Sequence, residues 1–246
     1  PYKDRTATRL AYGNALLALG KTHEGVVVLD GDVKNSTYAE KFFGAYPERS
    51  FQSFIAEQNM VGMGMGFAAK GYVPFLATFA AFLTRAHDQV RMAAYSFSNI
   101  KLCGSHVGVS IGEDGPSQMG MEDLALFRPI PGCVVLYPSD AFSSEACVDA
   151  AARHQGMCYI RTTRPATPLI YSKDEPFPIG GSKILKAGDN DKATVVAAGI
   201  TVFEALKAHE ELKKEGIGIR VIDAYSVQPL DKENICLLYT SDAADE

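Results

Sequence analysis

The sequence predicts an α/β protein built on a mostly parallel, doubly wound sheet. The fold class follows from short β-branched runs that alternate with helical patterns along the chain. The composition, 47% hydrophobic and 22% charged over 246 residues, is ordinary for a soluble globular protein. Alternating strands and helices are typical of a parallel sheet covered by helices on both faces. The length allows one large domain or two smaller ones.

The predicted elements follow one another from residue 8 to residue 223. Apolar residues at helical spacing predict the helices, and short runs rich in Val, Ile and Phe predict buried strands. The predicted helices are 8–21, a segment that begins at 57, a segment over 79–94, 144–153 and 202–214, and the predicted strands are 26–29, 51–55, 73–78, 101–107, 133–137, 157–161, 193–198 and 219–223.

The composition divides the chain into parts. Residues 1–170 form the first predicted domain, and a Pro-, Gly- and Lys-rich stretch over 171–190 is typical of a linker with one hairpin. Residues 191–235 are predicted to form a second, truncated α/β domain, because one βαβ unit cannot bury both faces of its sheet. Residues 236–246 match a translated sequencing adapter, and we expect them to be a non-native tail.

Charge, hydropathy and cysteine usage exclude several classes of function. The net charge is −5 and no basic stretch stands out, so no nucleic-acid partner is expected. The most apolar run is interrupted by Lys70 and Pro74, so we expect no membrane span. Five cysteines at unmatched spacings indicate reduced thiols and a cytoplasmic protein. No His/Cys cluster has metal-ligand spacing, so no metal ligand is predicted in this chain.

Glu57 is the first candidate functional residue. It stands directly before a glycine-rich apolar run, residues 61–69, and is expected to lie in a low-dielectric place that disfavours the charged carboxylate and raises its pKa. Such a carboxylate suits general acid–base work. The alternative is a glutamate at a helix N-terminus that only stabilises the helix dipole.

Two aromatic residues follow the third predicted strand. Phe79 and Phe82 are three residues apart, which places them on neighbouring faces of the predicted helix. Aromatic residues at this spacing usually belong to the core. They acquire a function if a flat heterocycle must stack close to Glu57.

A glycine-rich loop over residues 104–118 carries several polar side chains. His106 can donate to an oxyanion or transfer a proton, and Asp114 and Gln118 lie on the same loop. Glycines let the backbone fold tightly around a small ligand. The alternative is an ordinary surface loop.

Arg9, Ser36 and Arg164 form a scattered set that could bind an anion. Arginine forks suit phosphate groups, and serine adds one further donor. Each of them alone is more typical of a solvated surface. The sequence contains no phosphate-binding glycine loop of the nucleotide-binding type and no serine-nucleophile motif.

Three stretches carry a resemblance to a known family. The runs IAEQNMVGMGMGFA, TFAAFLTRAHDQVRMAA and CGSHVGVSIGEDGPSQM resemble the transketolase family, in particular its animal type, and the similarity extends from about residue 4 to residue 235. The resemblance implies that residues 1–170 are the pyrimidine-binding domain and that residues 191–235 open the C-terminal domain. It also implies that the domain holding the diphosphate and Mg²⁺ of the cofactor is not included.

The resemblance implies a role for each candidate residue. The implied reaction transfers a two-carbon ketol unit from a ketose phosphate to an aldose phosphate with thiamine diphosphate as cofactor, in the pentose phosphate pathway. Glu57 would bond the N1′ nitrogen of the aminopyrimidine, and Phe79 and Phe82 would pack against that ring. His106 and Gln118 would contact the reacting oxygens. The remaining implied substrate contacts are Asp114 to a hydroxyl and Arg9, Ser36 and Arg164 to the sugar phosphate.

Partners and alternatives also follow from the resemblance. Family members are homodimers with an active site shared between subunits, so this chain would be inactive alone. One alternative is a non-catalytic transketolase-like partner subunit. Another is the related domain of 1-deoxyxylulose-5-phosphate synthase or of a 2-oxo-acid dehydrogenase beta subunit.

Overall fold

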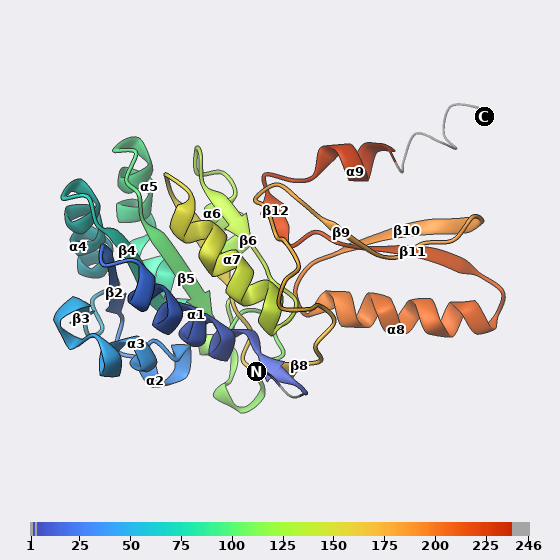
Figure 1. The fold of residues 1–246 in the computed structure, drawn as a ribbon, viewed down its shortest axis with the longest axis horizontal. Coiled ribbons are helices and arrows are strands. Elements are labelled where there is room, and N and C mark those ends of the chain that lie inside the picture. The colour runs from blue at the N-terminus through green and yellow to red at the C-terminus, as the bar shows by residue number, and fades with distance from the viewer. Residues whose placement is uncertain (1, 3, 238–246) are drawn as a thin grey trace.

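The protein contains a seven-stranded, mostly parallel sheet, which confirms the predicted α/β class (Figure 1). The structure is a computed structural model that describes residue 2 and residues 4–237, except for the side chains of residues 236 and 237. The strand order is β12-β6-β7-β5-β4-β2-β3, with all neighbours parallel except β12 and β6. The strands are β2 (Val26–Asp30), β3 (Ser50–Gln52), β4 (Val73–Phe79), β5 (Lys101–Ser105), β6 (Val134–Leu136), β7 (Cys158–Arg161) and β12 (Ser226–Gln228).

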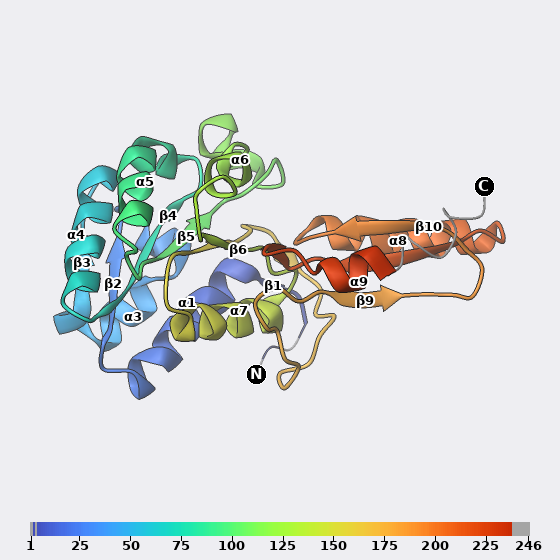
Figure 2. The ribbon, with the colours of Figure 1, turned by 90° about the horizontal axis from the view of Figure 1, so that it is seen from above.

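Helices cover both faces of this sheet, as Figure 2 shows. On one face α1 packs against α7 and α3, and on the other face α4 packs against β4 and α5. Helix α4 approaches β4 closely at Gly64, where an added Cβ would lie 2.9 Å from Leu76 side-chain carbons. The helices of this unit are α1 (Thr8–Thr22), α2 (Lys34–Thr37), α3 (Glu40–Ala45), α4 (Glu57–Ala69), α5 (His87–Tyr95), α6 (Asp123–Phe127) and α7 (Ala141–Arg153).

Short single-turn segments connect several of these elements. They include η1 (Pro47–Arg49), η2 (Phe82–Ala86), η3 (Gly112–Asp114) and η4 (Pro116–Gln118). A two-stranded antiparallel pair, β1 (Thr6–Ala7) and β8 (Ala166–Thr167), joins the start of the chain to the segment after β7.

The structure corrects the predicted helix over residues 79–94. Phe79 is the last residue of β4, Phe82 begins η2, and the α-helix starts only at His87. Phe79 continues the apolar run of β4, and such a run is typical of a strand that lies inside the sheet and is covered by helices on both faces. The predicted strand over 101–107 also ends early, at Ser105, because His106 has a φ of +61°.

A second, smaller sheet has the order β10-β11-β9. Strands β10 (Asp191–Ala197) and β11 (Gly218–Asp223) are parallel, and β9 (Lys183–Lys186) runs antiparallel to β11. Helix α8 (Thr201–Lys214) packs on this sheet (Figure 1). After β11 the chain forms β12 in the first sheet and then α9 (Lys232–Leu237). Apart from the backbone of residues 236 and 237, the expected non-native tail lies outside the described residues.

A buried carboxylate connects the two sheets. Asp223 at the end of β11 accepts hydrogen bonds of 2.7 Å from Ser139 Oγ and from Tyr171 Oη. Burial raises the pKa of Asp223 to about 6, and these two hydrogen bonds oppose the shift. The end of the second sheet is therefore held by Ser139, which follows β6, and by Tyr171, which packs in the core beside the first sheet.

None of the helices within the described part of the chain is both long and apolar enough to cross a membrane.

Candidate active site

The candidate residues gather at the carboxyl ends of the parallel strands. Phe79 ends β4, His106 follows β5, and Arg164 follows β7 by three residues. Ser36 lies on α2 after β2, and Arg9 lies in the first turn of α1. Open parallel sheets bind ligands at this edge.

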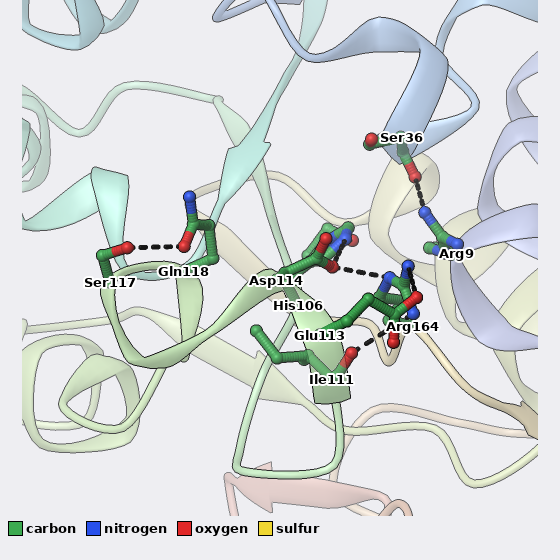
Figure 3. Close-up of polar contacts among 10 residues, drawn as sticks. Arg9, Ser36, His106, Ile111, Glu113, Asp114, Ser117, Gln118 and Arg164 are labelled. Carbon is green, nitrogen blue, oxygen red and sulfur yellow. Dashed lines mark hydrogen bonds and ion pairs between the residues drawn. The ribbon is translucent and has the colours of Figure 1, made fainter.

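Arg164 is surrounded by the glycine-rich loop (Figure 3). Its Nη2 donates to Glu113 Oε1 at 2.7 Å, and its Nη1 donates to the carbonyl of Ile111 at 3.2 Å. Its Nε lies 2.6 Å from Asp114 Oδ2. This last contact is an ion pair without hydrogen-bond alignment, because Asp114 Oδ2 has no hydrogen-bond partner among the described residues. All three guanidinium nitrogens thus face groups of the loop.

His106 lies beside this ion pair. Its ring is buried, Nε2 is 3.6 Å from Asp114 Oδ2, and Nδ1 is 2.9 Å from Ser105 Oγ. Burial lowers the pKa of His106 to about 4, and the positive charges of Arg9 and Arg164 add to this effect, whereas Asp114 opposes it. The imidazole is therefore neutral at physiological pH and can both donate and accept a hydrogen bond.

Arg9 completes the charged group. Its Nη1 donates to the backbone carbonyl of Ser36 at 2.7 Å, and its guanidinium carbon lies 5.3 Å from the ring centroid of Tyr38. Its Nε is buried and has no hydrogen-bond partner among the described residues. Burial lowers the pKa of Arg9, with Arg164 adding to the shift. The structure thus brings Arg9 near Arg164, but the contact with Ser36 uses the carbonyl and not the hydroxyl.

An aromatic row leads from this group towards Glu57. The rings of Phe79 and His106 are stacked with centroids 3.8 Å apart, and Phe79 and Phe82 are stacked at 5.1 Å. The guanidinium carbon of Arg85 lies 5.2 Å from the Phe82 centroid. The two phenylalanines therefore connect two polar regions of the site.

Glu57 begins α4 and is buried, with 2% of its surface exposed. Its Oε1 accepts a hydrogen bond from Arg85 Nη1 at 2.9 Å, and the Arg85 side chain is 52% exposed. The expected position of Glu57 at a buried helix start is confirmed, whereas Arg85, its partner, is not among the predicted site residues. The signal available was weak: Arg85 follows Phe82 by three residues.

Gln118 lies on η4, and its Oε1 accepts a hydrogen bond from Ser117 Oγ at 2.6 Å. Figure 3 shows Gln118 separated from His106 and Arg164. The structure therefore brings His106, Asp114, Arg9 and Arg164 together but leaves Gln118 apart from them.

A buried ion pair between Asp123 and Arg161 lies next to the glycine-rich loop and contacts it through Gly120. Both Arg161 Nε and Nη2 donate to the carboxylate of Asp123, and the Tyr159 hydroxyl donates to it at 2.6 Å. Gly120, three residues earlier, donates its N–H to the carbonyl of His106 at 3.0 Å. The sequence alone does not predict this pair, since Asp123 and Arg161 are 38 residues apart.

Among the described side chains, no group of three or more potential metal ligands occurs.

Comparison with known proteins assigns the family. The model of the transketolase pyrimidine-binding domain matches residues 4–169, and that of the transketolase C-terminal domain matches residues 182–243. The chain belongs to the transketolase family. The second match reaches into the expected non-native tail.

Relatives and solved transketolase structures agree with this assignment. The chain is 56% identical to mouse transketolase-like protein 2 and 54% identical to rat transketolase, in each case over 94% of this chain and 37% of the relative. It therefore spans little more than a third of these curated relatives. Among solved structures, a split-gene transketolase described as an inactive beta4 tetramer has a TM-score of 0.85 at 41% identity, with 94% of this chain and 75% of that chain covered. A Pichia stipitis transketolase complexed with sedoheptulose-7-phosphate has a TM-score of 0.84 at 25% identity, with 94% and 36% covered.

Proposed function

We propose that this chain forms the half of a transketolase active site that holds the aminopyrimidine ring of thiamine diphosphate and the sugar phosphate. The complete enzyme would transfer a two-carbon ketol unit from a ketose phosphate to an aldose phosphate. The observation that carries the proposal is a continuous row of side chains at the carboxyl edge of the sheet. In order, the row is Glu57, Arg85, Phe82, Phe79, His106, Asp114 and Arg164.

The donor set fits an aminopyrimidine. A buried carboxylate at the start of a helix can accept a hydrogen bond from a ring nitrogen, and the stacked pair Phe79 and Phe82 offers a flat apolar wall. When bound, thiamine diphosphate supplies the nucleophilic carbon and the electron sink. Glu57 would hold a proton at the ring nitrogen, and the aromatic residues would fix the ring plane and exclude water. The diphosphate and Mg²⁺ would be held by another domain of the complete enzyme.

The polar group would bind the sugar. Neutral His106 can donate to, or accept a proton from, an oxygen at the reacting carbons, because its lowered pKa keeps it uncharged at pH 7. Asp114 would accept a hydrogen bond from a sugar hydroxyl, and Gln118 would contact a reacting oxygen. The cationic pair Arg9 and Arg164, together with Ser36, would bind the phosphate.

A shared active site implies a partner. We propose a homodimer of the complete enzyme, because the apolar side chains directly before Glu57 are exposed: Phe54 by 67% and Ile55 by 73%. We also propose a cytoplasmic location, supported by four buried free thiols, Cys103, Cys133, Cys147 and Cys158.

A calorimetric titration tests the half-site. The chain is titrated with thiamine diphosphate and Mg²⁺, alone and mixed with a transketolase diphosphate-binding domain. Binding only in the mixture supports the proposal. Tight binding by the chain alone would show that the diphosphate site is assigned to the wrong domain, and no binding in either case would contradict a competent half-site.

A substitution of Glu57 tests the mechanism. In an assembled enzyme that contains this chain, Glu57→Ala should abolish turnover, because the ring nitrogen loses the group that exchanges its proton, while the fold persists. Steady-state kinetics and circular dichroism are the measurements. Turnover at the wild-type rate in a folded variant would refute the role of Glu57.

The second candidate function is a non-catalytic partner subunit. The observation that favours it is the similarity to a split-gene transketolase whose solved tetramer is inactive. A turnover assay of the same mixture separates the two functions, because a non-catalytic subunit would associate with the diphosphate-binding domain without restoring turnover.

A further inference from the structure

We infer that Glu113 is an internal stand-in for the substrate phosphate: it occupies the guanidinium fork of Arg164 and leaves when a phosphate monoester binds. The inference rests on the proposed sugar-phosphate site and adds a residue that controls its affinity for phosphorylated ligands. Figure 3 shows Glu113 facing Arg164 from the loop.

Each nitrogen of the Arg164 guanidinium faces a group of the glycine-rich loop. Nη2 bonds Glu113, Nη1 bonds the carbonyl of Ile111, and Nε faces Asp114. A phosphate that binds arginine in the preferred bidentate way needs two of these donors. Both two-nitrogen edges of the guanidinium include Nη2, so the carboxylate of Glu113 competes with an incoming phosphate for Arg164.

Glu113 is the contact that can leave most easily. Its side chain is 76% exposed, so its charge regains water on release, and solvent screening weakens its ion pair. Asp114 is only 30% exposed and also contacts His106. A backbone carbonyl such as that of Ile111 cannot move without moving the loop.

The local charge also favours this exchange. Arg9 and Arg164 carry two positive charges, Glu113 and Asp114 carry two negative charges, and the lowered pKa of His106 leaves that ring neutral. With Glu113 in place, the net charge of these four side chains is zero, so they attract a phosphate dianion only weakly. Release of Glu113 leaves one net positive charge, and the buried Nε of Arg9, which has no hydrogen-bond partner among the described residues, keeps its capacity to donate.

Phosphate titration of the complete 246-residue chain tests this exchange. Inorganic phosphate is the probe, followed by phosphorus NMR at pH 7.5 and low ionic strength. Glu113→Gln should tighten phosphate binding by about three- to tenfold, because the competing carboxylate is gone and the repulsion of a dianion is reduced. The gain should shrink as salt is added.

Matched variants separate the effect of the length of the Glu113 side chain from the effect of its charge. Glu113→Asp keeps the negative charge but is one methylene shorter, so it should tighten binding by less than Glu113→Gln. Glu211→Gln, an exposed position on α8, removes the same charge far from the site and should leave phosphate affinity unchanged. Affinity for unphosphorylated fructose should not respond to Glu113→Gln.

The outcomes distinguish failure of the inference from failure of the proposed function. If wild-type binding disappears in Arg164→Gln and Glu113→Gln does not tighten it, the stand-in role of Glu113 is wrong and the sugar-phosphate site stands. If neither the wild type nor Glu113→Gln shows phosphate binding that depends on Arg164, both are wrong. Equal tightening by Glu211→Gln would also overturn the inference.

Discussion

Glu57 and Arg85 form an ion pair between a buried carboxylate and a half-exposed guanidinium. The two partners therefore differ in what their loss leaves behind. Without Glu57, the guanidinium of Arg85 can turn to water. Without Arg85, a buried negative charge loses its counter-ion, which is the costly case.

This asymmetry gives a stability prediction. Arg85→Gln should lower the free energy of unfolding by about 2 kcal/mol, whereas Glu57→Gln should lower it by less than about 1 kcal/mol. Urea unfolding of both variants at pH 7.5 measures the difference. A larger loss in Glu57→Gln than in Arg85→Gln would contradict this account of the pair.

The titration of His106 is a second prediction for a single residue. Burial lowers its pKa to about 4, so the folded chain binds fewer protons at this ring than the unfolded chain does. Stability from this group is therefore present above the unfolded pKa of about 6.5 and decreases as the pH falls towards 4. NMR of the ring nitrogens should show a midpoint near 4, and a midpoint near 6.5 would refute the buried, neutral state.

Among the elements, the glycine-rich loop depends on a support outside itself. Asp123 at the start of α6 and Arg161 at the end of β7 are buried and ion-paired, and Arg161 Nη2 donates to the carbonyl of Gly120, whose own N–H bonds the carbonyl of His106. The loop therefore has a fixed base and an exposed outer part that carries Glu113.

Loss of that base should be costly. Asp123→Ala leaves Arg161 buried without its carboxylate, and we expect the free energy of unfolding to fall by about 3 kcal/mol. The control is Asp149→Ala, which breaks an exposed ion pair with Arg153 one helical turn away and should cost less than about 0.5 kcal/mol. Chemical unfolding measures both variants. Similar losses of unfolding free energy would show that the buried ion pair between Asp123 and Arg161 does not stabilise the fold more than an exposed pair does.

The same elements show what the sequence could predict. Strands such as β2 and β4 are short apolar runs, and α1 has a clear apolar stripe, so their positions were predicted within a few residues. Phe79 was wrongly placed on a helix, because a buried strand and a buried helix have the same apolar composition over a few residues. Arg85 and Asp123 were missed because their partners are distant in sequence, and only the tertiary fold pairs them. The roles of the nine predicted site residues stay predictions.

For the whole molecule, Asp223 connects the two sheets and makes the stability of the chain depend on pH. Its folded pKa of about 6 lies above the ordinary aspartate value of 3.8, so the folded chain holds this proton longer than the unfolded chain. The stabilising contribution is complete below about pH 4 and is lost as the pH rises through 6. Asp140 nearby opposes ionisation, and Ser139 and Tyr171 favour it.

Asp223→Asn should remove this contribution. The wild type loses this stabilisation as the pH rises from 4 to 7, whereas the variant does not. The free energy of unfolding of the variant should therefore rise relative to that of the wild type over this range, by about 2 kcal/mol at most. Unfolding at pH 4, 5, 6 and 7.5 gives the slope, and the exposed Asp189→Asn serves as control. A difference that is constant over this range would contradict the raised pKa.

The path of the chain through β12 has a consequence for dividing the protein into pieces. Residues 226–228 return from the second unit and form the antiparallel edge strand beside β6. A piece that ends at residue 169, where the pyrimidine-domain match ends, would lack that strand and leave the backbone N–H and C=O groups of β6 open to pairing with another molecule. The smallest piece that keeps β6 paired on both sides therefore extends at least to Gln228.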